Sequence, residues 1–280
     1  MSSLRLPPGR ADADRLDAAQ LGRRSADCRF GAAGRQRRRG RGGPRRAGNP
    51  DLAPYVGIAV PGLDQDVAGD LQRTVGNAFR LNEEARRIAD AHDIAASVST
   101  VAWLGYRTPT PSSVVSQDRA DAGAPALSAF TDGLRVSRAV SGGAPQTLTT
   151  MGHSYGSLVV AKAAVAGADV DAVAVVGSPG LGFVTTPDAL RGRLYVSEAE
   201  GDNAVADSGW FTADPSGVRD GRHVFESDGG VDPYAVGDLP AQTSASHGHS
   251  QHYDRGTESL RSLGYLVLGQ TERVSGGPQR

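Results

Sequence analysis

The sequence predicts an α/β fold with a mostly parallel β-sheet and helices on both of its faces. Short apolar, often β-branched runs recur along the chain without alternating polar residues, so each is expected to be buried on both faces. Segments with apolar residues at helical spacing separate these runs, an order that favours parallel strands between layers of helices. At 280 residues, the chain is long enough for one such domain.

Five apolar runs are expected to form the strands of the sheet. Most of them end at or near a glycine or proline, as strands that lead into turns do. In chain order, the runs are residues 55–60, 97–103, 147–151, 172–176 and 193–196.

Four segments show the spacing of helices. They are residues 70–91, the stretch around 127–134, residues 158–166, and the stretch around 260–267 near the end of the chain. Residues 205–246 are rich in Gly, Asp and Ser and lack clear periodicity. A long stretch of this kind in a compact domain is typical of a functional loop or lid.

The first 49 residues differ in composition from the rest of the chain. Residues 1–46 carry 13 arginines against four aspartates, whereas the whole chain has a formal charge of −1, so the body is acidic. Gly, Arg and Pro dominate residues 30–49 and offer little to bury. We therefore expect a disordered segment over 1–49, a folded domain over 50–272, and a disordered tail over 273–280.

Clustered arginine suits contact with the phosphates of nucleic acid. However, no aromatic residue lies within the Arg/Gly run to stack on bases, so nucleic-acid contact by this arm is the less favoured interpretation. The N-terminus also lacks the apolar core of a secretory signal, which predicts a cytoplasmic protein.

Several other classes of protein are excluded by composition. No run reaches the ~18 apolar residues of a membrane-spanning helix, and the single cysteine, Cys28, excludes an intramolecular disulfide framework. No phosphate-binding glycine motif follows a strand, so no nucleotide cofactor is expected. The histidine tract 247–252 lacks nearby cysteines or a convincing set of carboxylates, so no metal is expected either.

One motif points to nucleophilic chemistry. The run Gly152–Gly156 (GHSYG) fits G-x-S-x-G, a pattern that is weak evidence by itself. Here an apolar strand runs directly into the motif and a helical segment leaves it at once. This is the context of a nucleophile elbow, in which serine occupies a tight strand-to-helix turn. We therefore predict that Ser154 is a nucleophile.

A serine needs a base, and the base needs an acid that orients it. In sheets of this kind the order along the chain is serine, acid, histidine. Asp202 follows the strand 193–196 at the edge where such sheets place catalytic groups, and it is the predicted acid. Glu200 and Asp207 are its rivals.

The predicted base is His249. It lies in a Gly/Ser-rich loop before the last helical segment, where the histidine of such a triad is expected. His247 and His252 remain as alternatives.

The same reasoning predicts an oxyanion hole built from backbone N–H groups. One is the N–H of Tyr155, directly after the nucleophile. The other comes from the loop after the first strand, at Leu63 or Gly62, where glycine lets the backbone approach a substrate closely.

Four segments together resemble an actinobacterial α/β-hydrolase family that is catalogued largely as a domain of unknown function. They are Val101–Tyr106 (VAWLGY), Gly152–Ser157 (GHSYGS), Gly177–Gly180 (GSPG), and Gly248–Ser250 shortly before Tyr253-Asp254. The resemblance spans about residues 48–270. It implies an α/β-hydrolase fold with Ser154 as nucleophile, Asp202 as acid and His249 as base. Residues 1–47 depart from the family pattern, so a sheet that is incomplete at its N-terminal end is an alternative.

The function predicted from these residues is a cofactor-free serine hydrolase. It would cleave an ester, thioester or amide of a small acyl substrate through an acyl-enzyme on Ser154. The alternative is a non-catalytic binding module with the same fold. Labelling by a fluorophosphonate probe that reacts with activated serines separates the two hypotheses.

Overall fold

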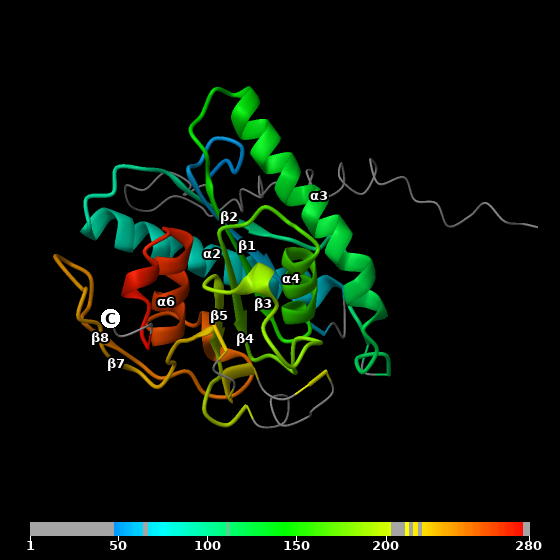
Figure 1. Cartoon of the computed structure of the whole chain (residues 1–280). Helices are drawn as coiled ribbons and strands as arrows, with labels where there is room; N and C mark the ends of the chain where they lie inside the picture. The colour runs from blue at the N-terminus through cyan, green and yellow to red at the C-terminus, as the bar shows by residue number, and fades with distance from the viewer. Residues whose placement is uncertain are drawn as a thin grey trace, which may run out of the picture.

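The computed structural model describes residues 48–63, 67–110, 112–202, 211–212, 215–217 and 220–276. At its centre lies a six-stranded sheet in the order β2-β1-β3-β4-β5-β6 (Figure 1). The strands are β1 (Tyr55–Val60), β2 (Val98–Ala102), β3 (Thr147–His153), β4 (Ala172–Val176), β5 (Leu194–Ser197) and β6 (His223–Val224). Every neighbouring pair is parallel, so all six carboxyl ends lie along one edge of the sheet.

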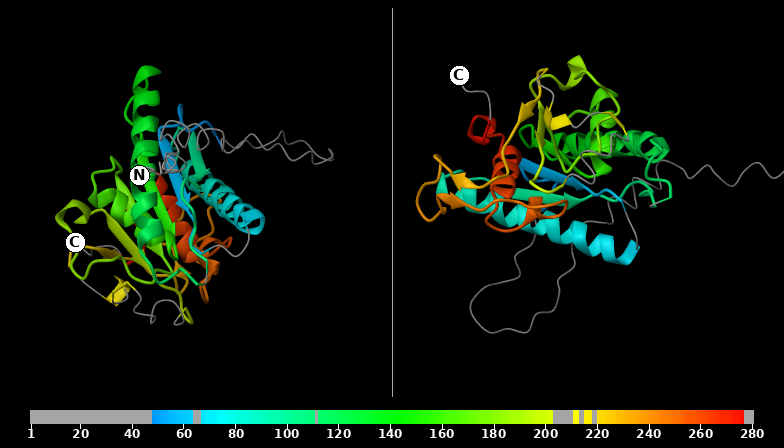
Figure 2. Two further views of the ribbon diagram at one scale, coloured as in Figure 1. Left: turned by 90° about the vertical axis from the view of Figure 1, so that its right-hand side faces the viewer. Right: turned by 90° about the horizontal axis from the view of Figure 1, so that it is seen from below.

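Helices cover both faces of this sheet, as the sequence predicts (Figure 2). On one face α3 (Asp118–Val140) packs against α4 (Gly156–Val165). On the other face α2 (Val67–Ala91) packs against α6 (Glu258–Val267). The mostly parallel sheet with helices on both of its faces, as predicted from the sequence, is confirmed.

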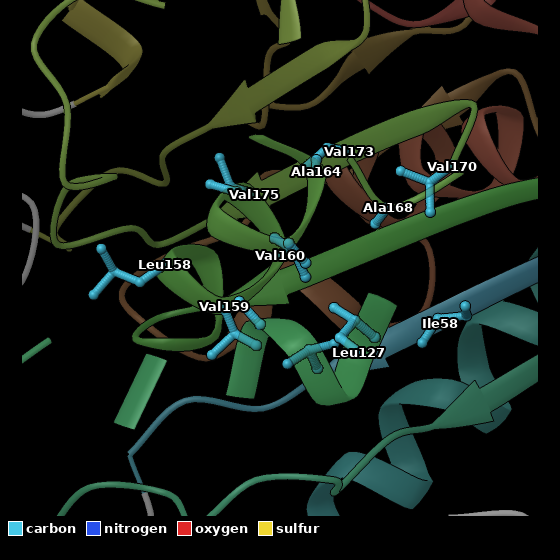
Figure 3. Close-up of a cluster of buried hydrophobic side chains, with 14 of the residues drawn as sticks. Ile58, Leu127, Leu158, Val159, Val160, Ala164, Ala168, Val170, Val173 and Val175 are labelled. Carbon is cyan, nitrogen blue, oxygen red and sulfur yellow. The ribbon is translucent and has the colours of Figure 1, made fainter. Parts of the chain in front are cut away.

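Two apolar clusters fill the space between the sheet and these helices. Figure 3 shows the cluster under α3 and α4, where Val173 and Val175 of β4 lie beside the helical residue Val160. The intervening residues of β4, Ala174 among them, belong to the cluster under α2 and α6. Successive strand residues point to opposite faces of the sheet, and both faces are covered by helices. All residues of the strand are therefore buried, which explains its uninterrupted apolar sequence.

The long helix α3 packs one face of apolar and small residues against the sheet and α4. Its buried residues recur every three or four positions, which places them on one face of the helix. They include Ala120, Ala124, Leu127, Thr131 and Leu134. Helix α6 begins at a conventional cap, because the Thr257 side chain accepts a hydrogen bond from the Leu260 N–H at 3.2 Å.

The remaining elements are short. Strands β7 (Gly230–Val231) and β8 (Gln242–Thr243) form a separate antiparallel pair. The described residues also include four 3₁₀ turns, namely η1 (Asp188–Leu190), η2 (Pro215–Gly217), η3 (Gln251–Tyr253) and η4 (Thr271–Arg273). Strands β6, β7 and β8 lie within the stretch 205–246, for which the sequence predicts no regular structure.

The ends of the chain bear on the predicted domain limits. Residues 1–47, which carry most of the Arg/Gly-rich segment, lie outside the described residues. At the other end, the ordered body extends past residue 272, because Val274 is 4% exposed and packs in the cluster of α6. Within the described residues, no helix has the length and apolar character that crossing a membrane requires.

Candidate active site

Ser154 lies on a tight turn between β3 and α4. Its φ is +55°, a left-handed conformation that residues other than glycine seldom adopt. The Ser154 N–H donates to the Val176 carbonyl oxygen of the neighbouring strand at 3.1 Å, and only 8% of the residue is exposed. A serine held in a strained turn at the carboxyl edge of the sheet has the geometry of a nucleophile elbow.

The two glycines of the motif are required by close contacts. A Cβ at Gly152 would lie 2.6 Å from the Gly156 carbonyl oxygen. A Cβ at Gly156 would lie 2.5 Å from the carbonyl oxygen of Val60, at the end of β1. Any side chain at either position would push α4 away from the strands and so displace the turn that holds Ser154.

His249 lies in the loop before η3, and main-chain contacts join this loop to the segment after β5. The Gly248 N–H donates to the Glu200 carbonyl oxygen at 2.8 Å, and Glu200 forms an isolated parallel bridge with His247. These contacts lie just before Asp202 and His249 in the chain and bring together two residues that are 47 positions apart.

The result is a close carboxylate–imidazole pair. His249 Nδ1 lies 2.9 Å from both carboxylate oxygens of Asp202. The Asp202 side chain is 1% exposed, whereas that of His249 is 31% exposed. Since a carboxylate only accepts hydrogen bonds, Nδ1 donates and Nε2 is left as the basic nitrogen of the ring.

The charge of Asp202 is maintained despite its burial. Burial pushes the pKa of Asp202 upward, but hydrogen bonds with His249 and Glu198 outweigh this effect and leave the pKa below its ordinary value. An ionised, buried carboxylate against Nδ1 can fix the orientation of His249 and stabilise a positive charge on its ring.

The predicted alternatives to this pair occupy other environments. His247 Nδ1 lies 3.6 Å from Glu200, and both side chains are more than half exposed. His252 is fully buried, with Nδ1 3.3 Å from Ser259 Oγ. Asp207 lies outside the described residues.

The histidine within the motif makes a contact that no sequence spacing predicts. His153 Nε2 lies 2.6 Å from the His249 backbone oxygen, and the centroids of the two rings are 4.6 Å apart. Burial, followed by the nearby rings of His249 and His252, lowers the pKa of His153 to about 3. A neutral His153 therefore donates to the loop that carries His249.

The loop after β1 meets the elbow directly. A Cβ at Gly62 would lie 2.5 Å from Ser154 Cβ, so only glycine fits there. Among the described residues, none accepts a hydrogen bond from the N–H of Gly62, Leu63 or Tyr155. These are the three amides that the sequence predicts for an oxyanion hole. Tyr155 follows Ser154 in the chain, and Gly62 lies against the Ser154 side chain.

Ser154 and His249 line one pocket of about 330 Å³. Gly62 and Leu63 line it from the β1 loop, and α2 contributes polar side chains. The lining residues outside the candidate triad and that loop include Arg73, Thr74, Asn77, Val114, Pro179, Ser250 and Tyr253.

No hydrogen bond joins Ser154 Oγ to His249 within the described part of the chain. Such bonds are often long without substrate and shorten only in the complex.

The sequence does not predict the part that α2 plays in this pocket. Arg73, Thr74 and Asn77 lie close together on the helix, and the polar face that they form is the sequence feature that could have indicated this role.

A larger cavity of about 950 Å³ lies around α6, β6 and residues 271–276, but none of the candidate site residues lines it. In the ranges that the structure describes, no three His, Cys, Asp or Glu side chains are grouped to hold a metal ion.

Comparison with curated proteins finds relatives in mycobacteria. An uncharacterized protein of Mycobacterium tuberculosis is 29% identical over 250 residues, covering 81% of this chain and 37% of the relative. A second uncharacterized protein of that species is 38% identical over 138 residues, covering 48% of this chain and 50% of the relative. The chain therefore spans only about a third to a half of the length of these relatives.

Comparison with solved structures gives weak similarities, among them the following two. One is a Trichoderma reesei cutinase in complex with a phosphonate inhibitor, with 12% identity and a TM-score of 0.39, covering 79% of this chain and 78% of that one. The other is the esterase domain of a Rhodothermus marinus protein, with 12% identity and a TM-score of 0.37, covering 79% of this chain and 87% of that one.

The family comparison covers the nucleophile elbow and most of the sheet. Residues 44–208, more than half of the chain, match the sequence profile of an α/β hydrolase family. The match includes Ser154 and Asp202, and it ends before His249. The chain belongs to the α/β hydrolase family.

Proposed function

We propose that this protein is a serine hydrolase that cleaves an ester, thioester or amide through an acyl-enzyme on Ser154. The main observation in support is the pair formed by Asp202 and His249, with Nδ1 2.9 Å from both carboxylate oxygens, in a pocket shared with Ser154. The strained turn at Ser154 adds independent support, because a buried φ of +55° at a non-glycine residue is a feature of functional sites.

The first half of the reaction forms the acyl-enzyme. His249 Nε2 takes the proton of Ser154 Oγ as that oxygen attacks the carbonyl carbon of the substrate. Asp202 holds the ring in the tautomer that leaves Nε2 free and stabilises the imidazolium. The carbonyl oxygen becomes negatively charged and accepts hydrogen bonds from the N–H of Tyr155 and from that of Leu63 or Gly62.

The acyl-enzyme forms when the imidazolium gives its proton to the leaving alcohol, thiol or amine and the bond from that group to the carbonyl carbon breaks. The second half then releases the acid. A water molecule then attacks the acyl carbon while His249 accepts its proton. The acyl–Oγ bond breaks, Ser154 regains a proton, and a carboxylic acid leaves. No cofactor enters this sequence.

The pocket favours a small acyl substrate. Its volume of about 330 Å³ is at the lower end of small-molecule sites. Apolar side chains of Val60, Leu63 and Val114 line it beside the polar residues of α2. An acyl group of modest size fits such a lining without exposed apolar surface.

The decisive experiment is labelling with a fluorophosphonate, which phosphonylates an activated serine. We expect rapid labelling of the wild type and none of Ser154→Ala. Ser262→Ala is the matched control, because Ser262 is also a buried serine, at 2% exposed, but lies on α6 away from the pocket. A folded wild type that resists the probe, or Ser154→Ala that is still labelled, would leave the non-catalytic binding module as the better hypothesis.

A further inference from the structure

We propose that Tyr106 is a positioning residue that holds the loop Pro61–Leu63 and thereby aims the amides of the oxyanion hole. This inference rests on the proposed serine hydrolase function. Tyr106 lies in the segment that follows β2, more than 40 residues from the loop that it contacts.

The contact is made by the phenolic hydroxyl. Tyr106 OH donates to the Pro61 carbonyl oxygen at 2.6 Å and lies 3.4 Å from the Gly62 carbonyl oxygen. The Pro61–Gly62 peptide is trans, so the Gly62 N–H points opposite to the Pro61 C=O. Fixing that carbonyl therefore fixes the direction of the Gly62 N–H, and the adjoining Leu63 N–H follows from the same loop conformation.

The Pro61 carbonyl also contacts the helix that follows the nucleophile. A Cβ at Gly156 would lie 2.6 Å from the Pro61 oxygen. This oxygen therefore approaches both the first residue of α4 and the hydroxyl of Tyr106. Because Gly156 is two positions after Ser154, these two contacts relate the loop to the nucleophile.

Tyr106 itself has little freedom to move. Its ring is stacked with those of Trp103 and Tyr155, with interplanar angles of 12° and 9°. From the side of α3, Gly123 approaches so closely that a Cβ there would lie 2.9 Å from Tyr106 Cβ. These three contacts fix the ring, so the hydroxyl is presented to the loop in one position.

Loss of this hydroxyl should act on the transition state. Oxyanion donors act through preorganisation, and they are aimed where charge develops rather than at the bound substrate. Without the hydroxyl, the Pro61 carbonyl loses its donor and the loop amides are less well aimed. The substrate would still enter the same pocket, so the effect should fall on kcat and leave KM nearly unchanged.

The test is Tyr106→Phe, assayed by hydrolysis of p-nitrophenyl butyrate. The phenyl ring keeps the stacking, so the variant should fold. We expect kcat to fall about 10-fold, less than the ~10²–10³ lost on removal of an oxyanion donor itself, with KM within about twofold. The matched control is Tyr265→Phe, which removes a buried hydroxyl that donates to Asp232 at 2.9 Å, near the larger cavity. Its kcat should equal that of the wild type.

A second measurement separates this inference from the proposed function. NMR order parameters of the Gly62 and Leu63 amides should fall in Tyr106→Phe and stay unchanged in Tyr265→Phe. Equal kcat in the wild type and Tyr106→Phe, a rise in KM alone, or the same loss of kcat in the control would overturn the role of Tyr106. If the wild type shows no Ser154-dependent turnover, the hydrolase proposal fails, and unchanged order parameters would then overturn the loop contact as well.

Discussion

His153 Nε2 lies 2.6 Å from the backbone oxygen of His249, so the residue before the predicted nucleophile holds the loop of the predicted base. A carbonyl oxygen can only accept a hydrogen bond, and Nε2 of His153 must therefore carry the proton. The contact joins the end of β3 to a loop about a hundred residues later in the chain. It sets the position of the His249 backbone, while Asp202 sets the orientation of the ring.

The first prediction concerns this hydrogen bond. Replacing His153 by Leu removes the donor and should lower kcat about 10-fold or more, because small displacements of catalytic groups are costly. His153→Gln keeps an N–H donor at a similar reach and should recover most of the rate. The measurement is kcat on p-nitrophenyl butyrate for both variants. An equal loss of kcat in His153→Leu and His153→Gln would show that the missing hydrogen bond is not its cause.

The second prediction concerns stability against pH. Burial is the largest cause that lowers the pKa of His252 to about 4 and that of His153 to about 3. An unfolded chain binds protons at these residues below ~6.5, whereas the folded protein does not. The unfolded state therefore gains protons first, and the free energy of unfolding should fall as the pH drops from ~6.5 toward 4.5, by up to ~1.4 kcal/mol per pH unit for each histidine.

Denaturant unfolding at several pH values between 4.5 and 7 measures this slope. His252→Asn removes one of the two groups and should make the slope shallower by about half, whatever its effect on stability at pH 7. His247→Asn is the control for the loss of a histidine, because His247 is exposed and lies outside the buried pair. A slope that is the same in all three proteins would contradict the prediction.

The third prediction uses a glycine that the sequence did not single out for the site. Gly177 follows β4 with φ +57°, and a Cβ there would lie 2.9 Å from Asp202 Oδ2 and 3.1 Å from His249 Nδ1. Gly177→Ala should separate that pair and lower kcat on the order of 10². Gly142→Ala is matched in backbone strain, at φ +69°, but has no atom within 4 Å of the added Cβ.

Both alanine variants should lose stability because each places a side chain at positive φ, and Gly177→Ala should lose more because its Cβ also meets the Asp202–His249 pair. Only Gly177→Ala should lose turnover. Thermal unfolding and kcat, measured side by side, give the answer. Comparable turnover in the two variants would mean that the Asp202–His249 pair tolerates the added methyl group.

The sequence predicted the fold well because its strands are buried on both faces. Runs such as 172–176 carry no polar residue, and their boundaries in the structure match. Strand β6 was not predicted because its two residues, His223 and Val224, are too few to show the sequence pattern of a strand. Its place in the sheet depends on pairing with β5, which is a contact across the fold rather than a local pattern.

The candidate site was predictable only in part, for a similar reason. The serine lies in a local motif, which predicts the turn at Ser154. No local motif identifies the base, since His247, His249 and His252 lie within six residues of one another in a segment of loop-like composition. What separates them is the backbone contact between Gly248 and Glu200, which turns His249 toward Asp202. Such a contact has no signature in spacing.

The last prediction tests the acid. Asp202→Asn is nearly isosteric, so the fold should survive, but an amide can donate to Nδ1 and would favour the wrong tautomer of His249. The loss expected for this change in a serine triad is on the order of 10⁴ in kcat. Glu200→Gln is the matched control, because Glu200 is exposed and contacts His247 instead. It should cost less than about twofold, as exposed ion pairs contribute little.

Asp207→Asn tests the remaining rival for the role of acid. We expect near-normal turnover, because the buried carboxylate at 2.9 Å from His249 Nδ1 belongs to Asp202. Circular dichroism and thermal unfolding of all three variants show whether the fold is kept. If Asp207→Asn lost most of its turnover and Asp202→Asn kept nearly normal turnover, the role of acid would be assigned to Asp207. The roles proposed for Ser154 and His249 would survive that result, since neither depends on which carboxylate orients the ring.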